Sequence, residues 1–561
     1  MSSWLDTLFN ASSTPKTYNI RPMVLLVLDG WGIAPPSAGN AMSQARLPRW
    51  DQLISEYPNT KLIASGESVG LPANEVGNSE VGHLTMGVGR TVLESLPRIN
   101  KAIETGDFYS NRALLKAISY ARENNTNLHV CGLIGSGNVH SSTEHLFALL
   151  ELCKRQSFTR VYLHLFTDGR DAPPQDGAGV METIEKRLVE LQLGQIVSVA
   201  GRYYAMDRDA RWERTEKVYR VMTLGEGATA TSASEAIKSS YEQNLTDEFV
   251  IPTLINQPGK PPVFIKDGDA MIYFNFRVDR ARQLRQVFVL PDFEQGILVE
   301  SSKNSTEQKR VSTFERPVIL KNLCFVTMTE YQHNLPVSAV AYPKIDVEHT
   351  LSEVLAQQNL RQFHLAESEK EKMVTYYFDG MRLEPFSGED IMIVPSSKVG
   401  TYDRKPEMSL SEIMREFHLA LEKDVYHFIV MNFANPDMVA HSGNLSASIK
   451  ACEIVDRAVG EIVDVLIERQ GTLCITADHG NVEELLTYDQ SSFFFTSSPG
   501  TVNTEHSNNP VPFVIMNPAF KNNPAIQLRP GALSDVAPTM LGMMNLPVPK
   551  EMTGNNLLEQ K

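Results

Sequence analysis

The sequence is poor in cysteine, in long apolar runs and in clustered basic residues. Its 561 residues include five scattered cysteines with no CxxC pair, so we expect neither a disulfide scaffold nor a zinc–thiolate site, and we expect a reducing compartment, the cytoplasm. No apolar run approaches the ~20 residues of a membrane helix. Lysine and arginine number 52 against 67 aspartates and glutamates, a net charge of −15. Without a long basic run, this charge argues against nucleic-acid and membrane partners.

The length of the chain exceeds what one hydrophobic core normally fills, so we expect at least two domains. The first 20 residues are rich in Ser and Thr. They lack the basic start and apolar centre of a signal peptide, so we interpret them as a polar leader. There is no internal repeat and no low-complexity block to suggest a fibrous or disordered class.

Three predicted strands are each followed by an acidic residue. Met23 to Leu28 (MVLLVL) leads to Asp29, residues 426–433 (YHFIVMNF) lead to Asp437, and residues 472–476 (TLCIT) lead to Asp478. Continuous apolar runs are typical of buried parallel strands, and residues 447–469 show helical spacing between two of them. Ligands bind at the carboxyl edge of such sheets. We therefore predict an α/β fold with a site at this edge.

The middle of the chain has its own alternation of strands and helices. Strands are predicted at 161–166, 196–200 and 271–276, a helix at 177–193, and an exposed polar loop at 301–310. If the three strands that precede acids share one sheet, the middle must be a domain inserted into the first. The predicted domains are residues 21–95 with 344–561, and residues 96–343. The chain would cross between them near 93–97 and near 341–345.

Aspartate and histidine residues at these strand ends suggest a metal pair. Asp437 and His441 are four residues apart, so one helical turn would present both to one ion. Asp478 and His479 are adjacent after a strand, His506 follows, and Asp29 adds a carboxylate. Taken singly, such residues are more often surface pairs or turn residues. Together they predict a dinuclear site that suits Mn²⁺ or Zn²⁺ and also accepts Mg²⁺.

A glycine-rich segment from Ala64 to Arg90 contains six glycines and the stretch GNSEVGH, with Ser79 at its centre. It matches neither a Walker phosphate loop nor the GxSxG elbow of α/β-hydrolases. Ser79 is either a residue of a phosphate-cradling turn or a nucleophile, and a metal could lower the pKa of its hydroxyl.

Arginines follow the predicted strands of the middle region. Their planar guanidinium groups suit bidentate binding of phosphate and carboxylate, so they favour a small substrate with several negative charges. The alternative is that they form surface salt bridges with neighbouring aspartates. His140 follows another strand-like run and could donate a proton. The candidate arginines are Arg170, Arg202, Arg208, Arg277 and Arg280.

Several longer motifs carry a resemblance to a known family. GNSEVGH, DGRDAPP, GRYYAMDRDARW, NFRVDRARQ, AESEK, VPSSKVGTYDRKPEMS, NPDMVAHSG and TADHGN occur in this order between Pro22 and Leu557. The chain thereby resembles the cofactor-independent phosphoglycerate mutases, which belong to the wider alkaline-phosphatase-like group. The resemblance implies a metal-binding, phosphatase-like domain with a second α/β domain inserted into it.

The resemblance also implies roles for residues. Ser79 would be the nucleophile that becomes phosphorylated, Lys370 would lie near it, and Asp171 or His140 would handle the hydroxyl protons of the glycerate. One metal would be held by Asp437, His441 and His506, and the other by Asp29, Ser79, Asp478 and His479. The glycerate would be bound by His140, Arg170, Asp171, Arg202 and Arg208, and its phosphate by Arg277 and Arg280.

The implied cofactors are two Mn²⁺ per chain, with Mg²⁺ or another divalent metal as an alternative and without 2,3-bisphosphoglycerate. The implied partner is a small phosphoglycerate, and the implied state is a monomer. An inserted domain that closes would exclude water while the glycerate turns, with hinges near residues 95 and 343.

The sequence departs from the family pattern in two places, and three alternative functions remain. The stretch before Ser141 reads GLIGSGNVH where the family pattern is closer to GLVSDGGVH, and residues 291–316 form a longer polar segment that we interpret as a surface insertion. A phosphopentomutase or a metal-dependent phosphatase of the same superfamily should lack the arginine set. A binding module that keeps only the fold should have lost Ser79 or a ligand.

Overall fold

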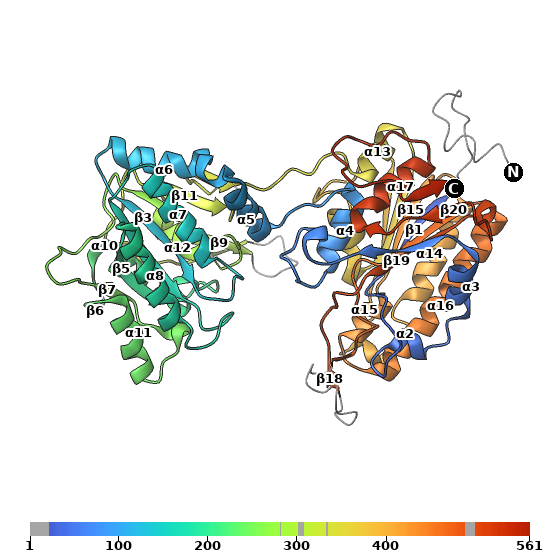
Figure 1. The fold of residues 1–561 in the computed structure, drawn as a ribbon, viewed down its shortest axis with the longest axis horizontal. Helices are drawn as coiled ribbons and strands as arrows, with labels where there is room; N and C mark the ends of the chain where they lie inside the picture. The colour runs from blue at the N-terminus through green and yellow to red at the C-terminus, as the bar shows by residue number, and fades with distance from the viewer. Residues whose placement is uncertain (1–21, 281, 301–307, 333–334, 488–499, 561) are drawn as a thin grey trace. The chain divides into compact units, whose positions relative to one another are not determined.

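The computed structural model describes residues 22–280, 282–300, 308–332, 335–487 and 500–560. The chain divides into two compact units, one built from the residues up to Glu94 and from Asp346 onward, the other from Ser95–Ile345. Each unit contains an eight-stranded sheet covered by helices (Figure 1). The α/β class is confirmed.

The sheet of the first unit is mostly parallel at its centre. Its strand order is β14-β13-β15-β1-β16-β19-β2-β21, and β19 runs antiparallel to both of its neighbours. The central strand β1 is buried along its whole length, as expected of an apolar strand covered on both faces. The strands are β1 (Met23–Leu28), β2 (Asn59–Ile63), β13 (Gln362–Glu367), β14 (Glu389–Val394), β15 (Phe428–Phe433), β16 (Thr472–Thr476), β19 (Val511–Met516) and β21 (Gly531–Ala532).

Helices cover this sheet in two groups. The first group packs around the long helix α16 (Leu445–Glu468), which contacts α2 (Ala41–Gln44) and α3 (Pro48–Glu56) (Figure 1). The second packs around α4 (Ser79–Val88), which contacts α13 (Leu351–Gln357) and α17 (Val536–Met543). One continuous cluster of buried apolar side chains joins the helices to the strands.

The register of the central strands decides where their carboxyl ends lie. Leu28 of β1 pairs with Phe433 of β15, and Val27 pairs with Thr476 of β16. The three strands that precede acidic residues are therefore neighbours in one sheet, as the sequence predicted. Because parallel strands end at the same edge, the segments that follow them start side by side.

The sheet of the second unit has the order β12-β11-β8-β3-β4-β5-β7-β6, with β7 antiparallel to β5. One face packs on α6 (Arg112–Glu123), α7 (Thr143–Arg155), α8 (Gly177–Leu191) and α11 (Ala233–Glu242), the other on α10 (Trp212–Leu224) and α12 (Arg282–Val289). Its strands are β3 (Leu128–Ile134), β4 (Val161–Thr167), β5 (Gln195–Gly201), β6 (Ala228–Ala230), β7 (Thr253–Ile255), β8 (Ala270–Tyr273), β11 (Cys324–Thr329) and β12 (Ala339–Tyr342).

Most predicted elements agree with these bounds to within two residues, and three of the differences have a clear physical reason. The strand predicted at 271–276 ends at Tyr273, because Phe276 donates its N–H to the carbonyl of His140 rather than to a neighbouring strand. The helix predicted to reach residue 193 ends at Leu191, where Gln192 takes a left-handed conformation. The prediction of a loop at 301–310 is wrong at its C-terminal end, where a strand forms.

Residues Gln308–Val311 form strand β10, which pairs antiparallel with β9 (Ile297–Glu300). The hairpin depends on backbone pairing between the two segments, because neither ILVE nor QKRV alternates apolar and polar residues. Residues 301–307 lie outside the described residues, as does the leader predicted at 1–20. Within the described ranges no helix has both the length and the apolar character needed to cross a membrane. All five cysteines are buried and free.

A close approach in the first unit brings α4 against the π-helical turn Met373–Tyr377. A Cβ atom on Gly87 would lie 2.0 Å from the carbonyl oxygen of Phe378. Only glycine allows this approach, because a backbone atom cannot move aside as a side chain can. The contact matters for the site, since α4 begins at Ser79 and the π-helical turn follows Lys370.

We expect Gly87→Ala to lower the free energy of unfolding by about 1–3 kcal/mol, the usual cost of overpacking. Thermal unfolding of the full-length protein would measure it. Gly179→Ala is the matched control, because Gly179 is an exposed glycine of α8 whose Cβ would meet nothing within 4 Å. That variant should gain up to about 1 kcal/mol from helix propensity. An unchanged midpoint for Gly87→Ala would contradict the close approach.

Candidate active site

Three carboxylates lie buried at the carboxyl edge of the first sheet. Asp29 follows β1, Asp437 lies in the short helix α15 (Asn435–Ala440) after β15, and Asp478 follows β16. Their exposed fractions are 0%, 1% and 0%. One ammonium group faces them, that of Lys370, whose Nζ lies 2.7 Å from Asp29 Oδ1 and 2.8 Å from Asp437 Oδ2. Three negative charges are thus matched by one fixed positive charge.

Ser79 is the first residue of α4 and is nearly buried, with 8% exposed. Its Oγ lies 2.8 Å from Lys370 Nζ, 3.0 Å from His479 Nε2 and 3.4 Å from Asp29 Oδ1. The preceding Asn78 caps the helix by accepting a hydrogen bond from the N–H of Val81. A helix N-terminus and an ammonium group both favour negative charge on this oxygen or on a group bound to it.

Three histidines of the site share one tautomer. Nδ1 of His441 lies 2.7 Å from the carbonyl of Thr504, Nδ1 of His506 lies 2.7 Å from that of Gly77, and Nδ1 of His479 lies 3.3 Å from that of Gly480. A carbonyl only accepts, so each Nδ1 carries the hydrogen and each Nε2 presents a lone pair when the ring is neutral. Metal-ligating histidines have this arrangement.

The Nε2 lone pairs face one another and carboxylate oxygens. His441 Nε2 lies 3.2 Å from His506 Nε2, and the two lie 3.3 Å and 3.5 Å from Asp437 Oδ1. Two facing lone pairs repel unless a proton or a cation lies between them. On Asp478, the buried Oδ2 accepts no well-aligned hydrogen bond, although His83 Nδ1 lies 3.3 Å away. These observations, with three carboxylates around one ammonium group, fit divalent cations.

The pKa shifts follow from burial and from this charge imbalance. Burial and the neighbouring Asp478 raise the pKa of Asp29 to about 7. Burial opposes the charge of Lys370, yet Asp29 and Asp437 hold its pKa well above the usual range. The hydrogen bond with Asp437 raises the pKa of His441 to about 9, whereas burial lowers that of His479 to about 4. His479 is therefore neutral near pH 7.

The ligand atoms form overlapping groups in which all members lie within 4.8 Å of one another. One contains Asp437, His441 and His506, and another contains Asp29, Asp437 and His479. Asp478 belongs to a third group with Asp29 and His83. The structure thus brings together all seven residues that the sequence suggested as ligands. It also adds His83, which the sequence analysis missed.

His83 is better described as a support than as a ligand. Its Nδ1 lies 2.9 Å from the carbonyl of Ser79, and its Nε2 lies 3.1 Å from the amide nitrogen of Asn432. The lone pair on Nε2 therefore accepts from an amide and is not free for a metal. The same amide lies 2.7 Å from Asp29 Oδ2 and fixes the orientation of that carboxylate.

Asn481 supports another candidate ligand, Asp437, in the same way as Asn432 supports Asp29. Its amide donates to Asp437 Oδ1 over 2.8 Å. Asn432 and Asn481 stand 403 and 44 residues from the carboxylates they support. The sequence analysis missed both, because an asparagine in or after an apolar strand carries no signal of its distant partner. The only local hint of a site is that the motif NPDMVAHSG follows β15 and the motif TADHGN begins at the last residue of β16.

The second unit holds the predicted substrate residues after the carboxyl ends of β3, β4, β5 and β8. Arg202, only 3% exposed, donates from Nη1 to Asp168 Oδ1 at 2.6 Å and to Asp171 Oδ2 at 2.5 Å. His140 Nε2 lies 3.3 Å from Asp171 Oδ2, and its Nδ1 lies 3.5 Å from Asp279 Oδ1. Burial and Arg202 lower the pKa of His140 to about 4.

Four guanidinium groups converge beside these residues. Burial and the charges of Arg208, Arg202 and Arg170 lower the pKa of Arg280. The carboxylate of Asp279 lies 3.2 Å from Arg208 and 3.4 Å from Arg277. Sequence reasoning missed Asp168 and Asp279, although both flank predicted arginines. The cluster suits a small anion that carries several charges.

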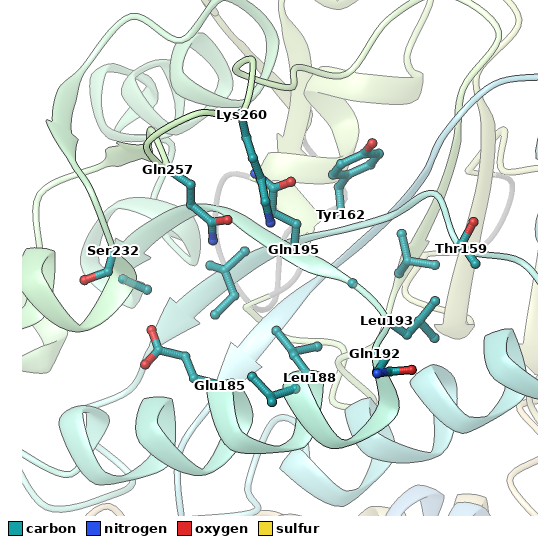
Figure 2. A pocket seen from close by; sticks show the side chains of 15 residues that line it. Thr159, Tyr162, Glu185, Leu188, Gln192, Leu193, Gln195, Ser232, Gln257 and Lys260 are labelled. Atoms are coloured by element: carbon teal, nitrogen blue, oxygen red, sulfur yellow. The ribbon is translucent and has the colours of Figure 1, made fainter.

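A cavity of the second unit lies elsewhere. It measures about 530 Å³ and is lined where β4 and β5 begin, by residues such as Tyr162, Gln195 and Leu188 (Figure 2). The arginines follow the other ends of these strands, seven residues away and roughly 20 Å along an extended chain. This cavity is therefore separate from the predicted substrate residues.

Comparison with known proteins identifies the family. The family model described as BPG-independent PGAM N-terminus matches residues 99–333. A 2,3-bisphosphoglycerate-independent phosphoglycerate mutase of Moorella thermoacetica is 46% identical over 538 residues, which cover 96% of this chain and 98% of that protein. The chain belongs to the 2,3-bisphosphoglycerate-independent phosphoglycerate mutase family.

Other members of the mutase family match equally broadly. The protein of that name from Clostridium perfringens strain 13 is 45% identical over 541 residues, covering 96% of this chain and 99% of that protein. A crystal structure of Leishmania mexicana phosphoglycerate mutase, at low cobalt concentration, is 27% identical with a TM-score of 0.61, covering 97% of this chain and 99% of that one. The metal-ligand clusters and the mutase family together indicate use of divalent metal.

We expect Lys370→Met to destabilise the metal-free mutase by about 3–5 kcal/mol, because it leaves buried carboxylates without their cation. A divalent cation should reduce this loss, since it supplies the missing positive charge. Thermal unfolding with chelator and with Mn²⁺ would measure both values.

Lys521→Met is the control. Lys521 forms an exposed ion pair with Glu56 at 3.0 Å, and solvent-exposed pairs of this kind contribute little to stability. Equal destabilisation of Lys370→Met with and without Mn²⁺ would contradict the charge-balance argument.

Proposed function

We propose that this protein interconverts 3-phosphoglycerate and 2-phosphoglycerate through a phosphoserine at Ser79, in glycolysis and gluconeogenesis. The observation that carries the proposal is the environment of Ser79 Oγ, which contacts Lys370 and His479 among three buried carboxylates. Relatives of nearly the same length bear the name of this mutase. The domain expectation stays part of the proposal: a metal-binding domain at 21–95 and 344–561, and a substrate domain at 96–343.

Two divalent cations, Mn²⁺ by preference and Mg²⁺ as the alternative, would be held by the predicted ligands. One set is Asp437, His441 and His506, and the other is Asp29, Ser79, Asp478 and His479. Bound cations at such a site lower the pKa of the serine hydroxyl and neutralise charge on the transferring phosphoryl group. The tautomers of the three histidines support this assignment, because each holds its Nε2 toward the carboxylates.

The chain's own residues set up the attack by Ser79. The ammonium group of Lys370 donates to Oγ and stabilises the alkoxide that forms when the hydroxyl proton leaves. As Oγ bonds to phosphorus, the bond from phosphorus to the glycerate oxygen breaks, and that oxygen takes up a proton. In the second half, the other glycerate hydroxyl loses a proton and its oxygen attacks the phosphorus of the phosphoserine, so the bond from phosphorus to Ser79 Oγ breaks and the leaving Oγ returns to the ammonium group of Lys370. Asp171 or His140 would hold these protons.

Recognition of the substrate would rest on the second unit. Arg277 and Arg280 would bind the phosphate, and Arg170, Arg202 and Arg208 would bind the glycerate with His140 and Asp171. The contacts of Arg202 support this role, because its ion pairs with Asp168 and Asp171 hold the guanidinium group in one orientation. Fixed guanidinium groups lose little entropy when they bind a carboxylate.

We place the protein in the cytoplasm as a monomer that binds no bisphosphoglycerate cofactor. Five buried free cysteines support a reducing compartment. The remaining alternatives are a phosphopentomutase and a metal-dependent phosphatase. The convergent arginines of the second unit favour the mutase over a simple phosphatase, which has no need to retain the dephosphorylated product.

An assay of the Mn²⁺-loaded protein with 3-phosphoglycerate, enolase and no 2,3-bisphosphoglycerate tests the proposal. We expect formation of 2-phosphoglycerate that stops on chelation and returns with Mn²⁺. Release of inorganic phosphate alone would instead support the phosphatase. Turnover that survives complete metal removal would contradict the metal assignment.

Ser79→Ala should abolish mutase turnover, by at least about 10³-fold, because no other hydroxyl lies within reach of Lys370 and His479 among the described residues. Metal content, measured by elemental analysis, should stay near that of the wild type because Ser79 is one of several ligands. Ser442→Ala serves as a control, since Ser442 bonds only within its own turn. Substantial residual turnover in Ser79→Ala would remove the serine from the mechanism.

A further inference from the structure

The carboxylate of Glu483 is buried at 1% exposure and accepts four hydrogen bonds. Oε2 accepts from the N–H of Gly32 at 3.0 Å and from the N–H of Asn481 at 2.9 Å. Oε1 accepts from the side-chain amide of Asn509 at 3.0 Å and from the hydroxyl of Ser507. In the described part of the chain it forms no ion pair with a basic side chain. Four donors alone stabilise its charge.

The four donors come from three segments, and each segment carries candidate ligands. Gly32 stands three residues after Asp29, Asn481 stands two residues after His479, and Ser507 directly follows His506. These segments are far apart in the chain, with 451 residues between Gly32 and Glu483. One carboxylate therefore joins the ligand segments of both predicted metal positions.

Two glycines make room for this carboxylate. A Cβ atom on Gly32 would lie 2.3 Å from Cδ of Glu483, and one on Gly480 would lie 2.4 Å from its Oε1 and 2.3 Å from Ser507 Oγ. The backbone thus approaches the carboxylate as closely as hydrogen bonding allows. If the backbone lay farther from the carboxylate, a small residue with a Cβ atom would fit at these two positions.

We propose that Glu483 is a positioning residue that holds the segments of Asp29, His479 and His506 in ligand-binding geometry. This inference rests on the proposed function, because it concerns the metal site of that reaction. A carboxylate is required, since its two oxygens offer enough lone pairs for four donors. Glutamine of the same size would turn an NH₂ group toward two of those donors and lose their hydrogen bonds.

The test is Mn²⁺ binding to the full-length protein after chelation, measured by titration with detection of free Mn²⁺. We expect Glu483→Gln to weaken Mn²⁺ binding about 10- to 100-fold, as loss of such outer partners does in other metal sites. The measurement does not depend on turnover. Failure of the wild type to bind Mn²⁺ would count against the proposed function itself, whereas equal binding by wild type and Glu483→Gln would overturn only the role of Glu483.

Asp535→Asn is the matched control. Asp535 is also a buried carboxylate of the first unit, 6% exposed, and accepts from the backbone N–H groups of Ala532 at 2.8 Å and Asn555 at 2.7 Å. These segments carry none of the predicted ligands. We expect this variant to unfold at lower temperature but to bind Mn²⁺ within about twofold of the wild type. Equal weakening in both variants would show general destabilisation and overturn the proposal.

Ser507→Ala keeps the test decisive if Glu483→Gln fails to fold. It removes one donor to Oε1 and leaves the carboxylate in place. We expect Mn²⁺ binding about three- to tenfold weaker, because one of four hydrogen bonds that hold the segment after His506 is lost. Wild-type affinity in a folded Ser507→Ala variant would overturn the proposal.

Discussion

Three buried carboxylates that face a single ammonium group form the constraint on which the first unit depends. Burial of charge is costly unless opposite charge lies nearby. The parallel register of β1, β15 and β16 makes the burial unavoidable, because it ends all three strands at one edge of the sheet. Lys370 offsets part of the negative charge. Divalent cations are the natural partners of the remainder, and that charge balance links the fold to its chemistry.

The histidines and asparagines around this site follow from the same constraint. Backbone carbonyls hold the Nδ1–H groups of His441 and His506, so both rings turn their other nitrogen toward Asp437. Asn432 and Asn481 each donate to one oxygen of a carboxylate, which leaves the remaining electron pairs in fixed directions. These hydrogen bonds orient the side chains without the help of a metal or substrate. Preorganisation of this kind lets charge develop in a transition state without rearrangement of the protein.

In the proposed function, the second unit would recognise a small anion with several charges. Its arginines converge and would repel one another if Asp168, Asp171 and Asp279 did not lie between them. The carboxylates offset the repulsion between the guanidinium groups and direct them. The proposed function would give each of the two sheets its own task, phosphoryl chemistry in the first unit and substrate recognition in the second.

Much of this arrangement could be predicted from local sequence. Continuous apolar runs predicted β1, β15 and β16, and the acids after them predicted a site at their ends. What local sequence could not reveal was pairing over long distances. Asn432 supports Asp29 across 403 residues, and Glu483 reaches Gly32 across 451. The strand at Gln308–Val311 was missed for the same reason, because it exists only through pairing with Ile297–Glu300.

The most direct test of the account is to find the phosphoryl group during turnover. Mn²⁺-loaded protein would be mixed with 3-phosphoglycerate, quenched in denaturant within milliseconds, digested and mapped by mass spectrometry. The account predicts a phosphoryl group on Ser79 that appears before 2-phosphoglycerate reaches equilibrium. Formation of 2-phosphoglycerate with a phosphoryl group on another residue, or with none on the protein, would contradict it.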